Sequence, residues 1–225
     1  MIATLTAALF ALLLVAGMPL LSYSTGRNPH IRELPRRDLY FSAALSQWLV
    51  TAAGAGIVWW AAPQVFASGF RRAPLGPTLV WAVCITGAAL VGLAAVIFCE
   101  RRGWLPREPD LIHFLIPQTR QEKLWAALLV ATTAACCEEF LFRGFLLAEL
   151  RLWSHSAGWA WFGSSVAFGL AHSYQGLSGM ARAALLGALL AWPVVALGSL
   201  YAAMLAHWMI DAAALVYLGP RMLRD

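Results

Sequence analysis

The sequence predicts an all-α membrane protein, a polytopic bundle of transmembrane helices, and three observations support this. Apolar residues make up 61% of the 225 residues, and charged residues only 12%. The mean hydropathy is +0.70, and a soluble globular chain of this length needs far more polar surface. The apolar residues also gather in continuous runs close to the roughly 20 residues that a helix needs to cross a bilayer.

We expect these runs to form about seven transmembrane helices, and the two shorter runs leave an eighth span or a re-entrant segment open. Backbone groups in lipid must be satisfied within the segment, and the runs lack the alternation of barrel strands, so helix is expected throughout. The first run lacks a preceding basic residue and a convincing cleavage site, so we interpret it as a retained helix. The runs are Ile2–Leu21, Phe41–Ala62, Thr78–Phe98, Leu124–Leu147, Trp159–Leu170, Ala181–Leu197 and Leu200–Leu218.

The loops predict the orientation in the cell membrane. With seven spans, most Lys and Arg residues fall in the loops on the side of the C-terminus, for example Arg36, Arg37, Arg101 and Arg102. Cytoplasmic loops carry an excess of basic residues, so we expect the N-terminus outside and the C-terminus in the cytoplasm; an eighth span would reverse this parity. Anionic lipid accounts for the formal net charge of +5, so no nucleic-acid partner is expected.

Ionisable residues lie inside the most apolar part of the chain. Each costs roughly 2.5–3.5 kcal/mol at mid-membrane depth on insertion scales, so a cluster of them indicates a functional site. We therefore divide the chain into residues 1–123, with membrane helices and basic loops, and residues 124–218, a four-helix catalytic core. The cluster that indicates the site consists of Glu138, Glu139, Arg143, His172, His207 and Asp211.

Two adjacent acids in the fourth run are expected to differ in role. Glu139 and Arg143 lie one turn apart at 100° per residue, and a Glu four residues before an Arg favours an intrahelical ion pair. That pairing offsets much of the cost of both charges in lipid, so Glu139 is predicted to be structural. Glu138 is left without a local counter-ion, and a carboxylate in an apolar site becomes a competent proton acceptor near neutral pH. Glu138 is the candidate general base.

Two further segments supply partners for such a base. His172 follows the fifth run, and His207 and Asp211 lie on one face of the seventh because they are four residues apart. Imidazoles can hydrogen-bond a water, bind a metal or donate to an oxyanion. The three segments can therefore bring one acid, two histidines and a second acid into one buried pocket.

These motifs together resemble the CAAX-processing and bacteriocin-processing (CPBP, or Abi) family of intramembrane proteases, related to CAAX prenyl protease type 2. The family pattern is E-E-x-x-x-R, then F-x-x-x-H, then H-x-x-x-N/D on successive core helices. The resemblance covers about Leu124 to Leu218, and the first three runs show nothing specific to the family. The matching residues are Glu138, Glu139 and Arg143, then Phe168 and His172, then His207 and Asp211.

The resemblance implies hydrolysis of a peptide bond in a membrane-associated or lipidated protein or peptide. Glu138 would activate the attacking water with His172 orienting it, while His207 and Asp211 would stabilise the tetrahedral oxyanion. Phe168 would support the site. Asp211 stands where the prenyl-protein proteases carry Asn, and an ionised carboxylate cannot donate to an oxyanion. Asp211 must therefore be protonated, orient His207 or help to bind a metal.

Two questions about the chemistry stay open. A metal-free glutamate mechanism without a cofactor is favoured, because there is no H-E-x-x-H motif. The alternative is a three-ligand zinc site with an open position, made from His172 and His207 with either Glu138 or Asp211. The substrate is undetermined among prenylated C-terminal peptides, bacteriocin or pheromone precursors, and C-terminal sorting signals.

A rival interpretation is a protein that is not an enzyme. In a proton-coupled transporter or a partner-binding scaffold, the same acids and histidines would relay protons or hold helices together. The weak internal repeat expected of many transporters is not visible. A rhomboid-like serine protease is also considered, because Ser164 and Ser165 lie in an apolar run, but the G-x-S-G arrangement is lacking.

Overall fold

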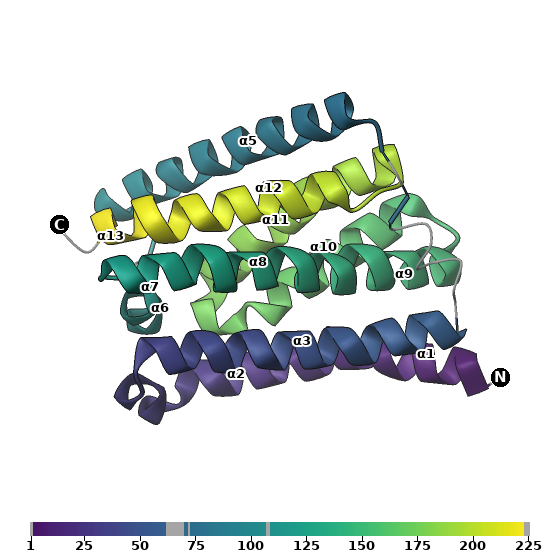
Figure 1. Ribbon diagram of the computed structural model, residues 1–225, viewed down its shortest axis with the longest axis horizontal. Helices are drawn as coiled ribbons and strands as arrows, with labels where there is room; N and C mark the ends of the chain where they lie inside the picture. Colours follow the sequence, from purple (N-terminus) through teal and green to yellow (C-terminus); the bar gives the residue numbers. More distant parts are fainter. Residues whose placement is uncertain (1, 62–69, 72, 107–108, 223–225) are drawn as a thin grey trace.

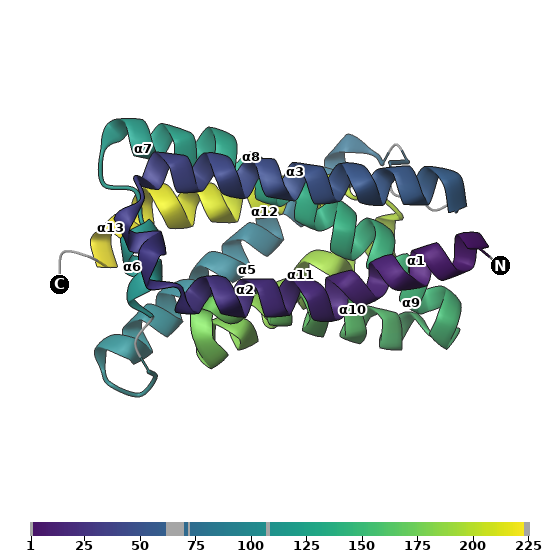
Figure 2. The ribbon, with the colours of Figure 1, turned by 90° about the horizontal axis from the view of Figure 1, so that it is seen from below.

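The computed structural model describes residues 2–61, 70–71, 73–106 and 109–222, and within these ranges all regular structure is helical. The predicted all-α class is therefore confirmed. The long helices run roughly side by side along the bundle (Figure 1). Figure 2 shows α3 (Arg36–Ala61) alongside the helix that contains α8 (Ala131–Thr133), whereas α2 (Met18–Arg27) lies alongside α10 (Ala157–Ala171), which packs against α11 (Gly176–Leu197).

Six helical stretches of the described chain are long and apolar enough to cross a membrane. The fifth predicted run corresponds to α10, which has only 15 residues and so falls short of the roughly 20 that a span needs. Four of the other predicted runs lie within longer helices, whereas the run Phe41–Ala62 ends one residue beyond α3, outside the described residues, and Leu200–Leu218 begins one residue before its helical stretch. The six stretches are Ile2–Arg27, Arg36–Ala61, Leu75–Arg101, Arg120–Ser154, Ser173–Leu197 and Tyr201–Leu218.

Several stretches combine shorter helical elements. The first consists of α1 (Ile2–Leu12), η1 (Leu13–Gly17) and α2, and the second and third are α3 and α5 (Leu75–Arg101). The fourth contains α7 (Arg120–Trp125), η3 (Ala126–Val130), α8, η4 (Ala134–Leu146) and α9 (Leu147–Ser154). The last contains α12 (Tyr201–Ala213) and η6 (Ala214–Leu218). The fifth consists of η5 (Ser173–Gln175) and α11, and the remaining short elements are η2 (Pro29–Glu33), α6 (Asp110–Leu115) and α13 (Gly219–Met222).

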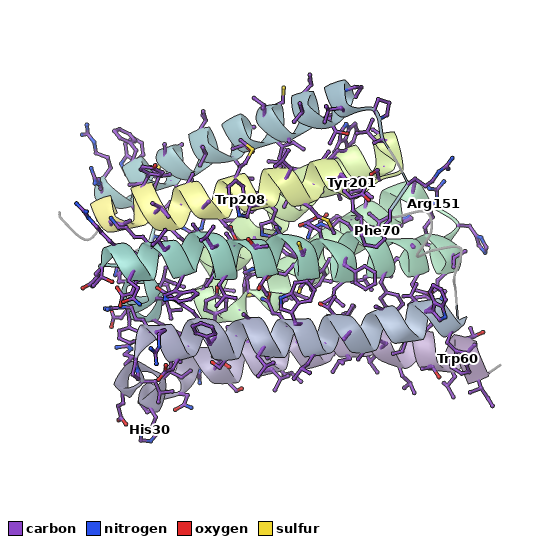
Figure 3. The ribbon with its side chains drawn as sticks, viewed as in Figure 1. His30, Trp60, Phe70, Arg151, Tyr201 and Trp208 are labelled. Atoms are coloured by element: carbon purple, nitrogen blue, oxygen red, sulfur yellow. The ribbon has the colours of Figure 1, made fainter. Side chains whose placement is uncertain are left out.

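The first and last helices lie at opposite ends of the bundle. α1 begins at the end where α9 lies, whereas α13 lies at the other end, near α6 and α7 (Figure 1). Arg151 and Trp60 are found at the first end and His30 at the second (Figure 3). This arrangement agrees with an odd number of crossings, and the side that faces the cytoplasm stays a prediction.

The outer surface of the bundle is apolar, as expected of a multi-pass membrane protein. Large hydrophobic side chains project outwards from several long helices, among them Leu9 on α1, Leu49 on α3, Val83 on α5 and Leu185 on α11. Contiguous apolar surface of this extent is rare on soluble monomers. The surface is instead suited to lipid, where an exposed Leu has no hydration cost.

The interior is packed by aromatic residues and by glycines that allow close helix contacts. Phe142 and Phe168 pack edge to face with ring centroids 5.2 Å apart, which joins η4 to α10. At Gly169, an added Cβ would lie 2.6 Å from Met180 O and 2.7 Å from the Ala184 Cβ atom. Only glycine fits there, so Gly169 lets α10 pack directly against α11 and fixes the position of the chain that leads to His172.

Polar contacts fasten the helix ends nearest to α6 and α7. Thr119 and Glu122 form a capping box at the start of α7, which satisfies two otherwise unpaired backbone N–H groups. The Glu122 carboxylate also lies 3.4 Å from Arg36 Nη1, and Tyr40 donates a 2.7 Å hydrogen bond to Leu115 O. The Arg36–Glu122 pair ties α3 to the start of the Arg120–Ser154 helix, which carries the predicted acids, and the Tyr40 bond ties α3 to α6.

Candidate active site

All the predicted site residues meet in one cluster between three helical segments. The acids and Arg143 come from η4, the Phe and the first His from α10 and its C-terminal end, and the second His and Asp from α12. Each of the four predicted catalytic side chains lies within 3.9 Å of another member of that group. The cluster consists of Glu138, Glu139, Arg143, Phe168, His172, His207 and Asp211.

The segment that carries the acids is a π-helix of 13 residues, whereas the sequence-based geometry assumed 100° per residue. Its closing hydrogen bond runs from Leu147 N back to Phe142 O, five residues earlier. Such wide turns in a helix frequently occur at functional sites. The predicted pairing still forms, since Arg143 Nη1 lies 3.1 Å from Glu139 Oε1.

Arg143 is buried, and its charge is compensated by an ion pair and an aromatic ring, not by hydrogen bonds from the described residues. Its guanidinium carbon lies 4.0 Å from the centroid of the Phe168 ring, a favourable cation–π arrangement. An added Cβ at Gly187 would lie 3.2 Å from Arg143 Nη2, so α11 closes over the guanidinium. Within the described chain, the three guanidinium nitrogens have no hydrogen-bond partner. The ion pair with Glu139 and the Phe168 ring are therefore the contacts that support this charge.

Glu139 also orients His207, a contact that the sequence did not predict. His207 Nδ1 lies 2.7 Å from Glu139 Oε1, and an ionised carboxylate only accepts, so Nδ1 carries the proton. The other ring nitrogen, Nε2, lies 3.5 Å from Asp211 Oδ2 and 3.9 Å from Glu138 Oε2. Glu139 thus serves His207 as well as Arg143, in the manner of the carboxylates that orient functional histidines.

His172 is oriented by the end of its own helix. Its Nδ1 lies 2.8 Å from Phe168 O, and because a carbonyl only accepts, this nitrogen is the donor. In the neutral ring, Nε2 then carries the lone pair. Nε2 lies 3.9 Å from Glu138 Oε2. This distance is too long for a direct hydrogen bond, but a water molecule can bridge two polar atoms at such a separation.

Glu138 has a partner that sequence reasoning missed. Gln47 of α3 donates a 2.9 Å hydrogen bond from Nε2 to Glu138 Oε1. The available signal was a polar amide in the middle of the apolar run Phe41–Ala62, since polar side chains inside a membrane helix usually face a partner. The other carboxylate oxygen, Oε2, is buried and has no hydrogen-bond partner among the described residues.

Burial divides the cluster into an inner and an outer part. The side chains of Glu139 and His207 are 0% and 3% exposed, whereas those of Glu138, His172 and Asp211 are 14%, 18% and 26% exposed. Reactants therefore have access to the cluster from the side of Glu138, His172 and Asp211. Two cavities of about 330 and 230 Å³ lie away from the cluster, at the ends of the helices. The first is lined by residues that include Arg36 and Trp125, and the second by residues that include Gly26 and Arg32.

The sequence offered a metal site and the serines Ser164 and Ser165 as alternatives, and the described part of the chain bears on both. No group of three or more His, Cys, Asp and Glu side chains is arranged there to hold a metal ion. Ser164 and Ser165 are buried, and both hydroxyls donate to Trp161 O, at 3.2 and 2.7 Å. Both serines therefore act as packing residues of α10.

The comparisons with known proteins single out the same part of the chain. Residues 120–213 match the family model described as type II CAAX prenyl endopeptidase Rce1-like. The matched segment contains every predicted site residue, from Glu138 to Asp211, and leaves out Gln47. No curated protein and no solved structure matches the chain.

Proposed function

Because residues 120–213 match the type II CAAX prenyl endopeptidase Rce1-like family model, we propose that the chain is an intramembrane endopeptidase. The proposed substrate is a membrane-associated or lipidated protein or peptide. One observation carries the proposal: the Nε2 atoms of His172 and His207 each lie 3.9 Å from the same oxygen of Glu138. A carboxylate flanked by two oriented imidazoles has the groups that water activation requires.

In the proposed first step, Glu138 acts as general base. A water between Glu138 Oε2 and His172 Nε2 donates to both, and transfers one proton to the carboxylate as its oxygen attacks the carbonyl carbon of the peptide. The new C–O bond converts the carbonyl oxygen into an oxyanion. Glu138 then passes the proton to the amide nitrogen as the C–N bond breaks, which releases a carboxylic acid and an amine.

His207 and Asp211 are proposed to stabilise the oxyanion. The Nδ1–H of His207 is held by Glu139, so only the protonated imidazolium can donate from Nε2 to an oxyanion. Three carboxylates lie within 3.9 Å of the His207 ring, and an imidazolium is charge-compensated there. Asp211 Oδ2 lies 3.5 Å from His207 Nε2. From there, a protonated Asp211 donates to the oxyanion, or an ionised Asp211 keeps the His207 ring in position.

The proposed function is tested by the protein termini in cell membranes. Cells with the wild-type protein are expected to contain shortened termini of some membrane or lipidated proteins, and these are expected to be lost when Glu138→Ala replaces it. Quantitative mass spectrometry of termini measures this difference, with the amount of each variant in the membrane as the control. Identical termini in both strains would contradict a protease function in those cells.

A metal-free mechanism predicts that chelation leaves activity intact. After prolonged dialysis of the detergent-solubilised protein against EDTA and 1,10-phenanthroline, we expect cleavage of a prenylated peptide at the rate of the untreated sample. Elemental analysis of the same sample is expected to find much less than one zinc per chain. A loss of activity that added zinc restores would support the site of His172, His207, Glu138 and Asp211 as metal ligands instead.

A further inference from the structure

We propose that Gln47 is a positioning residue for Glu138, which fixes the carboxylate with one oxygen directed at the two histidines. The inference rests on the proposed function and adds a residue from α3, outside the segment that matches the family. Gln47 and Glu138 are 91 residues apart in the chain and come together only through the packing of α3 against η4.

The hydrogen bond has a defined direction. A carboxylate only accepts, so the amide NH₂ of Gln47 must face Glu138 Oε1, and their separation is 2.9 Å. The amide oxygen, Gln47 Oε1, is then left as an acceptor, and it is buried without a hydrogen-bond partner among the described residues. A buried amide oxygen without a partner costs free energy inside a membrane. We therefore expect the orientation of the Gln47 amide to have a role at Glu138.

The consequence of this bond is a fixed carboxylate plane. The last torsion of a Glu side chain is broad and nearly two-fold, so an unrestrained carboxylate turns easily. Because Gln47 holds Oε1, the other oxygen, Oε2, stays directed between His172 Nε2 and His207 Nε2, at 3.9 Å from each. Reacting groups need alignment of this kind, and small displacements cost much of the rate.

α3 itself is held firmly against the helix that carries Glu138. Trp48, next to Gln47, donates a 3.1 Å hydrogen bond from Nε1 to Thr133 Oγ1, and Arg36 Nη1 of α3 lies 3.4 Å from Glu122 Oε1 near the start of that helix. The Trp48–Thr133 bond joins the same two helices without contact to Glu138. Trp48→Phe therefore provides a matched control for any loosening of this helix pair.

The first test measures cleavage of a prenylated peptide in lipid vesicles by Gln47→Leu. We expect kcat to fall about 10- to 100-fold, the usual effect of removing a group that orients a functional side chain, with KM little changed. Trp48→Phe is expected to keep a near wild-type kcat. Equal losses in both variants would overturn the inference, because the effect would then come from helix packing alone.

A second variant gives a readout that a purely structural residue does not alter. Gln47→Glu brings a second carboxylate against Glu138, and two adjacent carboxylates resist ionising together. The acidic limb of the pH–kcat/KM profile is expected to move to higher pH, with His172, His207 and Asp211 still facing Glu138 in both proteins. An unmoved limb in Gln47→Glu would contradict a direct contact with the catalytic carboxylate.

A third readout separates failure of this inference from failure of the proposed function. Dicyclohexylcarbodiimide labels protonated carboxyl groups in membranes, and the labelling of Glu138 can be followed by mass spectrometry, with Glu138→Gln as the blank. We expect the labelling of Gln47→Glu to persist to higher pH than in wild type or Trp48→Phe. If the labelling shifts but no variant, including wild type, cleaves the peptide, the Gln47–Glu138 contact is supported and the proposed protease function is rejected. If Gln47→Leu cleaves normally and the labelling of Gln47→Glu is not shifted, only the positioning role of Gln47 is rejected.

Discussion

Replacing Glu138 with Gln is expected to lower kcat by about 10²- to 10⁴-fold, the range that a general base contributes, while the bundle stays assembled. The two side chains have nearly the same shape, so the packing around residue 138 is preserved, but an amide cannot accept the proton of the attacking water. The measurement is the rate of cleavage of a prenylated peptide in vesicles, together with the melting temperature of the purified protein.

The matched control for this substitution is Glu149→Gln. Glu149 is also a buried acid of the same long helix, only 5% exposed, and it lies in α9, outside the cluster. We expect this variant to cleave at close to the wild-type rate. Retained activity in Glu138→Gln would contradict the role of Glu138 as general base, and equal losses in both variants would indicate a general need for acids in this helix.

Replacing Arg143 with Met is expected to be the most destabilising of the changes considered, with a loss of about 3–5 kcal/mol in the free energy of unfolding. Met fills much of the same space, but it leaves the Glu139 carboxylate buried without its cation. The ring of Phe168 also loses the guanidinium 4.0 Å away. Reversible unfolding in mixed detergent micelles measures the change.

Two comparisons sharpen this prediction. The double variant Glu139→Gln with Arg143→Met removes both charges, and we expect it to recover part of the lost stability, because no uncompensated ion stays buried. Arg151→Met changes an exposed Arg of the same helix and is expected to shift the free energy of unfolding by less than about 0.5 kcal/mol. Equal stabilities of Arg143→Met and wild type would show that Arg143 is dispensable for the fold.

The parts of the site that the sequence predicted are those that stand out against an apolar background. Glu138, Asp211 and the two histidines are conspicuous because lipid disfavours them, and their clustering followed from that cost. The Glu139–Arg143 pair was predictable because both residues lie on one helix. The all-α fold class was also predictable, because a membrane excludes spanning structures other than helices and closed β-barrels.

Contacts between helices far apart in the chain could not be predicted in the same way. The hydrogen bonds of Glu139 with His207 and of Gln47 with Glu138 depend on which faces of the helices meet, and periodicity in one run says nothing of its neighbour. Helix ends were also set too tightly, because polar residues continue the helices beyond the lipid: α3 begins at Arg36, whereas the apolar run begins at Phe41.

One oxygen of Glu139 has a consequence for protein engineering. Oε1 lies 3.1 Å from Arg143 Nη1 and 2.7 Å from His207 Nδ1, so the same atom contacts both residues. Exchanging a buried ion pair for well-packed apolar residues is often neutral or even stabilising, and directed evolution for thermal tolerance can therefore select it. In this protein the same exchange would remove the carboxylate that fixes the tautomer and the orientation of the His207 ring. Screens for heat resistance alone would then enrich thermally stable variants that have lost the proposed proteolytic activity.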